Sequence, residues 1–143
     1  MSDNIYLGNP NLKKANTPIE FTQEQIAEFI KCKKDPVYFS KQYVKIVSLD
    51  EGLVPFIPYD FQEKLITNFH ENRFNICKMP RQTGKSTTCV SYLLHYAVFN
   101  DSVNIGILAN KAATARELLG RLQTAYENLP KWMQQGIIAW NKG

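Results

Sequence analysis

Cysteine and histidine are scarce in this sequence of 143 residues, and so are glycine and proline. The three cysteines stand far apart, with no C-x-x-C pair and only two histidines to help bind a metal. This argues against a disulfide framework and against a zinc site, and it predicts reduced thiols packed as small hydrophobic groups. Seven glycines and seven prolines also argue against a fibrous or disordered chain. The composition is typical of a globular protein.

Long hydrophobic runs are absent too. No stretch reaches the roughly 18 to 20 consecutive apolar residues that a membrane-spanning helix needs, and the first residues lack the basic and then apolar layout of a signal peptide. We therefore expect a protein that is not secreted, has no membrane partner and works in the cytoplasm. The length predicts one compact domain with at most a small appendage, at roughly 100 to 200 residues per domain.

Positive charge is in small excess, with a net charge of +4. Residues 1–59 have seven lysines and seven acidic residues, whereas residues 60–143 have ten lysines or arginines and six acidic residues. The whole excess lies in the second part of the chain. This distribution is compatible with a nucleotide or nucleic-acid partner, although an ordinary solvated surface has the same composition.

The first 58 residues predict an arm and a small helical subdomain. Residues 1–20 contain several breakers and no periodicity, so we expect an arm that is ordered only when something holds it. Residues 21–58 form the subdomain and a linker. A capping box at Thr22 and the pair Asp35-Pro36 predict the starts of two short helices, which end near residues 33 and 44. Extended chain around a turn at 50–52 follows.

Residues 59–143 alternate between helical and extended patterns. Apolar residues at spacings of three and four predict helices over 60–72, 86–99 and 111–128, the first one capped by Asp60 and Glu63, and short apolar runs predict strands over 74–78 and 103–109. Strands that alternate with helices predict an α/β fold with a parallel sheet and crossover helices. Two strands are too few for such a sheet, so we expect the front part of a larger domain.

A candidate phosphate loop lies between the first predicted strand and the helix that follows it. Its sequence is Met79-Pro80-Arg81-Gln82-Thr83-Gly84-Lys85-Ser86-Thr87. Phosphate oxygens need converging main-chain N–H groups, the positive end of a helix, a point charge and a hydroxyl for Mg²⁺. Gly84 would let the main chain approach, Lys85 would reach the β and γ phosphates, and Ser86 would bind Mg²⁺. The standard P-loop pattern has a glycine in place of Met79, and Gly-Lys-Ser alone could simply start a helix.

Gln62, next to Phe61 on the first turn of a predicted helix, is a second candidate. Its amide offers a donor and an acceptor that match the N6 amino group and N7 of adenine, and an aromatic ring can stack on a base. Taken alone, Gln62 would be an exposed helix residue and Phe61 a core residue. Together with the phosphate loop, the two residues favour an adenine site.

These motifs resemble the large terminase subunit family, the ATP-driven DNA-packaging motor of tailed double-stranded DNA bacteriophages. The resemblance covers most of the chain, through the segments 8–13, 59–62, 80–86, 103–111 and 129–143. Terminases have a deviant P-loop with an early arginine and no leading glycine, and here Arg81 and Met79 match both features. The mismatch to the standard pattern thus supports this family.

The resemblance implies a RecA-like P-loop ATPase fold that binds ATP and Mg²⁺ and couples hydrolysis to translocation of double-stranded DNA into the capsid. It implies that Phe61 and Gln62 bind adenine, that Arg81 senses the γ phosphate, that Lys85 is the essential catalytic lysine and that Ser86 holds the metal. It also implies a ring homo-oligomer on the portal protein of the procapsid, with the small terminase subunit as a further partner, in the infected bacterial host.

The family also has an apolar strand that ends in adjacent Asp and Glu, then a coupling motif, and then a nuclease domain. The acidic residues after Lys85 are Asp101, Glu117 and Glu127, and none follows a run of four apolar residues. We therefore expect residues 59–143 to be an incomplete ATPase domain that binds nucleotide without efficient hydrolysis. A helicase-like DNA translocase and a non-enzymatic nucleotide-binding module remain alternatives.

Three basic residues in and before the last long helix are weaker candidates for contacts with DNA phosphates: Lys111, Arg116 and Arg121. The solvated side of an amphipathic helix is the simpler interpretation of the same pattern.

Overall fold

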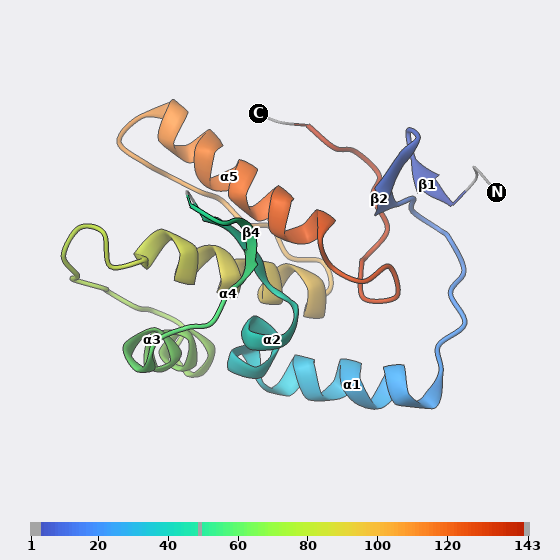
Figure 1. Cartoon of the computed structure of the whole chain (residues 1–143), viewed down its shortest axis with the longest axis horizontal. Coiled ribbons are helices and arrows are strands. Elements are labelled where there is room, and N and C mark those ends of the chain that lie inside the picture. The colour runs from blue at the N-terminus through green and yellow to red at the C-terminus, as the bar shows by residue number, and fades with distance from the viewer. Residues whose placement is uncertain (1–3, 49, 142–143) are drawn as a thin grey trace.

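The computed structural model describes residues 4–48 and 50–141, which fold into helices and two small hairpins (Figure 1). The helices are α1 (Gln23–Lys34), α2 (Pro36–Tyr43), α3 (Asp60–Glu71), α4 (Lys85–Phe99) and α5 (Ala112–Glu127). The strands are β1 (Ile5–Tyr6), β2 (Asn9–Lys13), β3 (Lys45–Ser48) and β4 (Gly52–Pro55), and they pair as two antiparallel sheets, β1 with β2 and β3 with β4.

The first two helices begin where the sequence predicts. At the start of α1 the Gln25 N–H donates to the Thr22 hydroxyl (3.2 Å) and the Thr22 N–H donates to the Gln25 side chain (3.1 Å), which completes the capping box. Asp35 ends α1 and also caps α2, accepting from the Tyr38 N–H at 2.9 Å. The cap of α3 differs from the prediction, because Gln62 rather than Glu63 reaches back, to the Tyr59 N–H.

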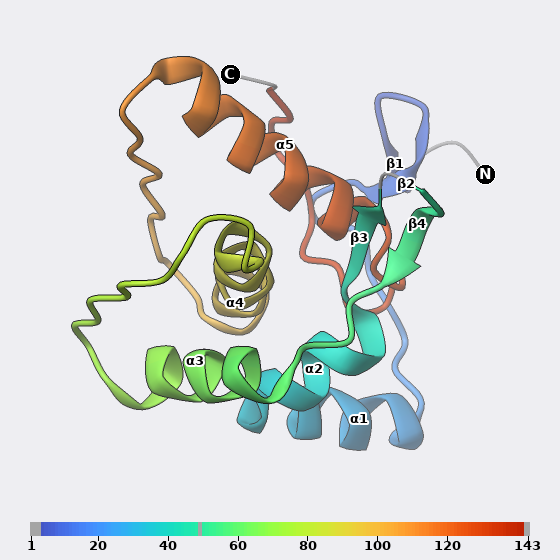
Figure 2. The same ribbon diagram turned by 60° about the vertical axis from the view of Figure 1, so that its left-hand side comes forward.

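Helix α4 is the centre of the packing. Figure 2 shows it end-on, with α5 on one side and α1, α2 and α3 on the other. Its apolar residues recur along much of its circumference, and Leu94, Val98 and Phe99 are buried with Phe39 of α2 and Ile66 of α3. The Ser40 and Ser91 hydroxyls are hydrogen-bonded at 2.7 Å inside this core, so α2 and α4 are also joined by a buried polar contact.

The predicted RecA-like parallel sheet is wrong for the residues that the structure describes. Segments 74–78 and 103–109 are extended but pair with no strand, and the sheets present are two-stranded and antiparallel. A strand is defined by hydrogen bonds to a neighbour, so an apolar run between helices predicts only its local conformation. Neither segment has a neighbour with which to form a ladder here, and the expected α/β architecture is replaced by a helical cluster with two hairpins.

The N-terminal arm is also more structured than predicted. Residues 5–13 form a hairpin, which lies beside residues 134–137 (Figure 1). The Gln134 side chain accepts from the Lys13 N–H (3.0 Å) and donates to the Asn11 carbonyl (2.8 Å), and Ile137 exchanges main-chain hydrogen bonds with Lys13 and Ala15. The expectation that something must hold the arm is thus met by residues 134–137, far away in the sequence.

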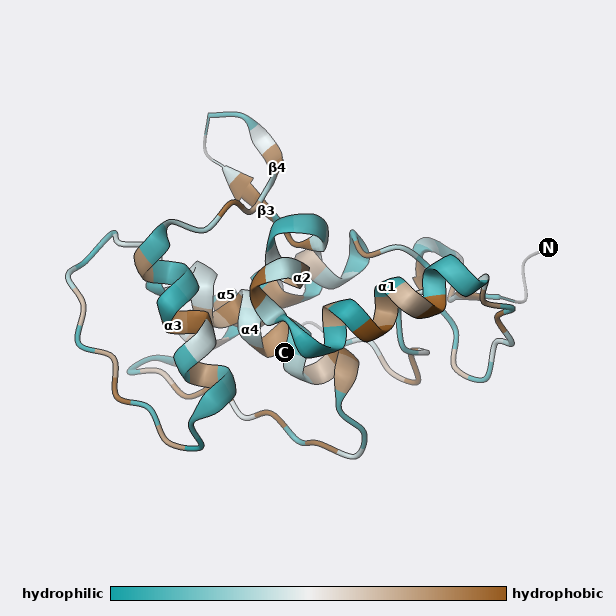
Figure 3. Cartoon of the chain, turned by 90° about the horizontal axis from the view of Figure 1, so that it is seen from below, coloured by the Kyte–Doolittle hydropathy of each residue, from teal (hydrophilic) through white to brown (hydrophobic). Residues whose placement is uncertain are grey.

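Surface hydropathy is uneven. In Figure 3 hydrophilic and hydrophobic residues are mixed along the helices, and hydrophobic residues also recur along the extended chain between them. Phe74, Ile76 and Leu108 in these extended segments are almost fully exposed. Among the described residues, no helix combines the length and the apolar character that crossing a membrane requires.

Candidate functional site

The candidate phosphate loop leads directly into α4, the central helix. Gly84 is its N-cap residue and has a left-handed conformation (φ +72°), which favours glycine because no Cβ then meets the following carbonyl oxygen. The first intrahelical donor is the Thr88 N–H, to the Gly84 carbonyl, so the main-chain N–H groups of Lys85, Ser86 and Thr87 are left without helical partners. A helix of 15 residues also directs its positive end to this point.

Lys85 folds back over its own loop. Its Nζ donates to the Met79 carbonyl at 2.8 Å, and the Thr83 hydroxyl donates to the Pro80 carbonyl at 3.0 Å. These two bonds close residues 79–85 into a compact turn, with Gln82 also left-handed (φ +60°). The ammonium of Lys85 is therefore held over the loop, and the residue that departs from the standard pattern, Met79, supplies its acceptor.

The remaining residues of the predicted site lie around this turn. Pro80, Arg81, Gln82 and Ser86 are exposed, whereas Thr83, Lys85 and Thr87 are half-buried. The structure therefore places one guanidinium and one hydroxyl, those of Arg81 and Ser86, on the solvent side of the turn. An exposed hydroxyl next to unpaired N–H groups fits a Mg²⁺-phosphate ligand, since Mg²⁺ prefers oxygen and keeps part of its water.

Gln62 is brought to the loop from α3. Only 4% of the residue is exposed, and both ends of its amide are used: Oε1 accepts from the Tyr59 N–H (2.9 Å) and Nε2 donates to the Thr83 carbonyl (3.4 Å). A Cβ at Gly84 would clash with Nε2 of Gln62. The two motifs that the sequence analysis singled out separately thus touch each other.

Phe61 lies outside the core, contrary to its reading as a core residue. Its ring stacks on Tyr59 with the centroids 5.9 Å apart and the planes 12° from parallel, and 45% of Phe61 and 70% of Tyr59 are exposed. Tyr59 is not among the residues predicted from the sequence, because it precedes the helix and helical spacing does not relate it to Phe61. Tyr59 is the N-cap residue of α3 and Phe61 lies in its first turn, so the exposed pair of rings stands at the start of this helix.

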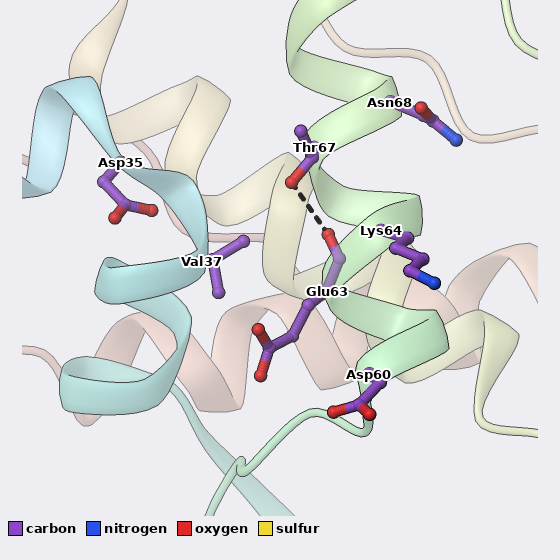
Figure 4. Close-up of a pocket in the computed structure, with 7 residues that line it drawn as sticks. All are labelled: Asp35, Val37, Asp60, Glu63, Lys64, Thr67 and Asn68. Atoms are coloured by element: carbon purple, nitrogen blue, oxygen red, sulfur yellow. Dashed lines mark hydrogen bonds between the residues drawn. The ribbon is translucent and has the colours of Figure 1, made fainter.

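Two open depressions lie away from this loop. One, of about 570 Å³, separates α2 from α3 and is lined by Asp35, Asp60, Glu63 and Lys64 among others (Figure 4). Two of its carboxylates already have local partners, since Asp35 caps α2 and Glu63 pairs with Lys41 at 2.6 Å. The second, of about 780 Å³, lies against α4 and residues 104–106. Across the described ranges, no group of three or more His, Cys, Asp or Glu side chains could hold a metal ion.

The basic residues around α5 are all exposed, as the solvated-face interpretation requires. Arg121 is bound to Glu117 on the same helix at 2.6 Å, which leaves its charge partly neutralised. These residues are therefore not brought together with the phosphate loop by any contact that the structure gives.

No protein-family model matches this sequence.

Proposed function

We propose that this chain is the Mg·ATP-binding part of an ATP-driven translocase of double-stranded DNA, a large terminase subunit of a tailed bacteriophage. The observation that supports it best is the turn at residues 79–85: a left-handed Gly84, a lysine held over the loop and unpaired N–H groups at the start of a long helix. This combination supplies donors, a cation and a positive helix end for one anionic ligand.

In this proposal the triphosphate lies against the N–H groups of residues 85–87, and Lys85 leaves the Met79 carbonyl to bind phosphate oxygens. Arg81 adds a second cation from the solvent side, and Ser86 contributes a hydroxyl to Mg²⁺. The metal supplies charge neutralisation of the phosphates. The nucleoside lies toward the start of α3, where Phe61 and Gln62 are. The DNA, portal and small-subunit partners rest on the family resemblance alone.

Hydrolysis by this chain alone is expected to be slow. Phosphoryl transfer needs an oriented water and stabilisation of developing charge as well as a phosphate cradle. No acidic side chain contacts residues 79–87 among the hydrogen bonds and ion pairs of the described chain. The activity proposed for the chain itself is therefore nucleotide binding, and hydrolysis belongs to the complete motor.

Calorimetric titration of the chain with Mg·ATP tests the proposal, with Lys85→Ala as the variant and Lys78→Ala as the control. Both changes remove one lysine near the loop, but Lys78 is exposed and precedes the turn. We expect Lys85→Ala to weaken binding about a hundredfold, the size of a charge-assisted contact to phosphate, and Lys78→Ala to leave it nearly unchanged. Equal affinities in the two variants, or no binding by the unaltered chain, would contradict the proposal. Rapid turnover by the chain alone would refute the binding-only part.

A further inference from the structure

A stripe of exposed apolar side chains runs along β4 and the two residues that follow it. Leu53, Pro55 and Ile57 are exposed, Ile57 to 74%, whereas Phe56 between them is only 4% exposed. Val47 of β3 is the Cα partner of Leu53 and is 68% exposed, so it widens the stripe. Successive residues of extended chain point to opposite sides, so one side can fill the core while the other covers the surface. We call Val47, Leu53, Pro55 and Ile57 the apolar stripe.

The hairpin that carries the stripe projects from the molecule and is acidic at its tip (Figure 3). Asp50 and Glu51, in the turn between β3 and β4, are both exposed. Neither forms an ion pair within the part of the chain that the structure describes. Residues 44–60 contain three acidic residues and one basic residue, Lys45. The apolar stripe and this tip together form what we call the acidic face, in which apolar side chains lie beside net negative charge.

The opposite side of the molecule is apolar and basic. Figure 2 shows the hairpin of β3 and β4 on one side of α4 and the extended segments 73–78 and 103–110 on the other. Residues 73–78 and 103–116 contain four basic residues and no acidic residue: Arg73, Lys78, Lys111 and Arg116. They also contain three apolar side chains that are almost fully exposed: Phe74, Ile76 and Leu108. We call these basic and apolar residues the basic face.

We propose that the acidic face of one chain binds the basic face of a second copy, head to tail. Each face offers exposed apolar area, whose burial favours association, and the two faces have opposite charge. Two acidic faces, or two basic faces, would instead bring like charges together, so charge disfavours a symmetric pair. A contact between two different faces leaves one of each kind free, so the assembly continues as an open chain or closes into a ring. The contact needs no nucleotide and therefore goes beyond the proposed function.

Sedimentation velocity of the full chain tests the contact with two charge-reversed variants. Asp50→Lys/Glu51→Lys reverses the acidic tip, and Lys78→Glu/Lys111→Glu reverses part of the basic face. We expect the unaltered chain to form assemblies larger than a dimer as its concentration rises to about 500 μM, and each variant to need at least about tenfold more protein. Salt between about 0.1 and 1 M should weaken the assemblies, because the screening length falls from about 10 to about 3 Å. An unaltered chain that stays monomeric over this range, or that stops at a dimer, would overturn the inference.

Mixing the two variants distinguishes a head-to-tail contact from other modes of association. In the mixture the reversed tip of one variant meets the reversed basic face of the other, and the two unchanged faces also match. We therefore expect the equimolar mixture to associate like the unaltered chain, although neither variant does so alone. Lys33→Glu/Lys34→Glu is the control, because it reverses two exposed lysines of α1 that lie outside both faces, and it should associate like the unaltered chain. No recovery in the mixture, or an equal loss in the control, would overturn the inference.

The apolar part of the contact has its own matched pair of variants. Ile57→Ser removes an exposed isoleucine of the apolar stripe without changing charge, and Ile26→Ser does the same on α1, where Ile26 is 47% exposed. Burial of one such side chain changes an affinity about tenfold, so Ile57→Ser should weaken association by about this factor and Ile26→Ser should not. Circular dichroism checks that both variants keep the fold of the unaltered chain. Equal association by the two variants would mean that the stripe lies outside the contact, and the inference would be wrong.

Discussion

The connections between helices are of two kinds in this molecule. Between α1 and α2 the chain turns on one residue, Asp35, which ends the first helix and caps the second. Between α3 and α4, and again between α4 and α5, the chain runs through long extended segments whose main chain over 73–78 and 103–110 makes no hydrogen bond to the described residues. The first kind is held by hydrogen bonds between neighbouring residues. Of the two long connections, the one between α3 and α4 contains the phosphate loop.

The difference shows what holds each region. Around α2 and α4, buried side chains hold the helices in place. Phe39 of α2 is completely buried and packs edge to face against Phe99 of α4. In the extended segments, Phe74 and Ile76 lie in solvent and contribute little burial. With so little burial, we expect the extended segments to be less stable locally than the core.

The largest effect separates the two regions directly. Phe39→Ala should lower the free energy of unfolding by about 3–5 kcal/mol, because it removes a completely buried aromatic ring and leaves a cavity. Phe74→Ala, the same change at an 81% exposed residue, should alter it by less than about 0.5 kcal/mol. Urea unfolding followed by circular dichroism measures both. Similar losses in the two variants would mean that the extended segment is as well packed as the core.

A pH dependence should arise from the core as well. Burial lowers the pKa of His95 to about 4, and its Nδ1 has no hydrogen-bond partner in the described structure. Below about pH 6.5 the unfolded chain therefore binds a proton at this histidine while the folded chain does not. The contribution of His95 to the free energy of unfolding is fully present above this pH and falls as the pH drops toward 4.

This loss should amount to about 3 kcal/mol between pH 7 and pH 4, measured as the unfolding free energy of the unaltered chain relative to His95→Leu. His70→Leu should leave most of the pH dependence in place, because burial is the main cause of the lowered pKa of His95 and the neighbouring His70 ring, 5.8 Å away between centroids, lowers it less. A pH profile that His95→Leu shares with the unaltered chain would contradict the assignment.

The smallest effect comes from alanine substitutions at two glycines, one in the phosphate loop and one in α5. Gly84→Ala should cost about 1–2 kcal/mol, since the left-handed backbone is strained for alanine and the new Cβ meets Gln62. Gly120→Ala, in the middle of α5 with open space around it, should instead stabilise the fold by about 0.5–1 kcal/mol. Thermal unfolding distinguishes the two signs. A stabilising Gly84→Ala would mean that the loop does not require its observed conformation.

Sequence reasoning was most accurate where the signals are local. The helices over residues 23–34, 36–43, 60–71, 85–99 and 112–127 lie within a few residues of their predicted bounds, because caps and apolar spacing act within one or two turns. The predicted strands failed for the converse reason. Segment 103–109 has the composition of a strand, but its pairing partner would have to come from elsewhere, and none of the described residues provides it.

The sequence by itself determined the helices and the turn before α4, because caps, apolar spacing and a glycine act on neighbouring residues. It also placed a glycine, a lysine and a hydroxyl next to one another in the phosphate loop. Only the tertiary structure decided that α4 is the centre of the core. It also decided that Gln134 is hydrogen-bonded to the N-terminal hairpin, and that the Gln62 amide donates to the Thr83 carbonyl instead of facing solvent. Each of these contacts joins residues distant in the chain, and no spacing rule relates them before the helices pack together.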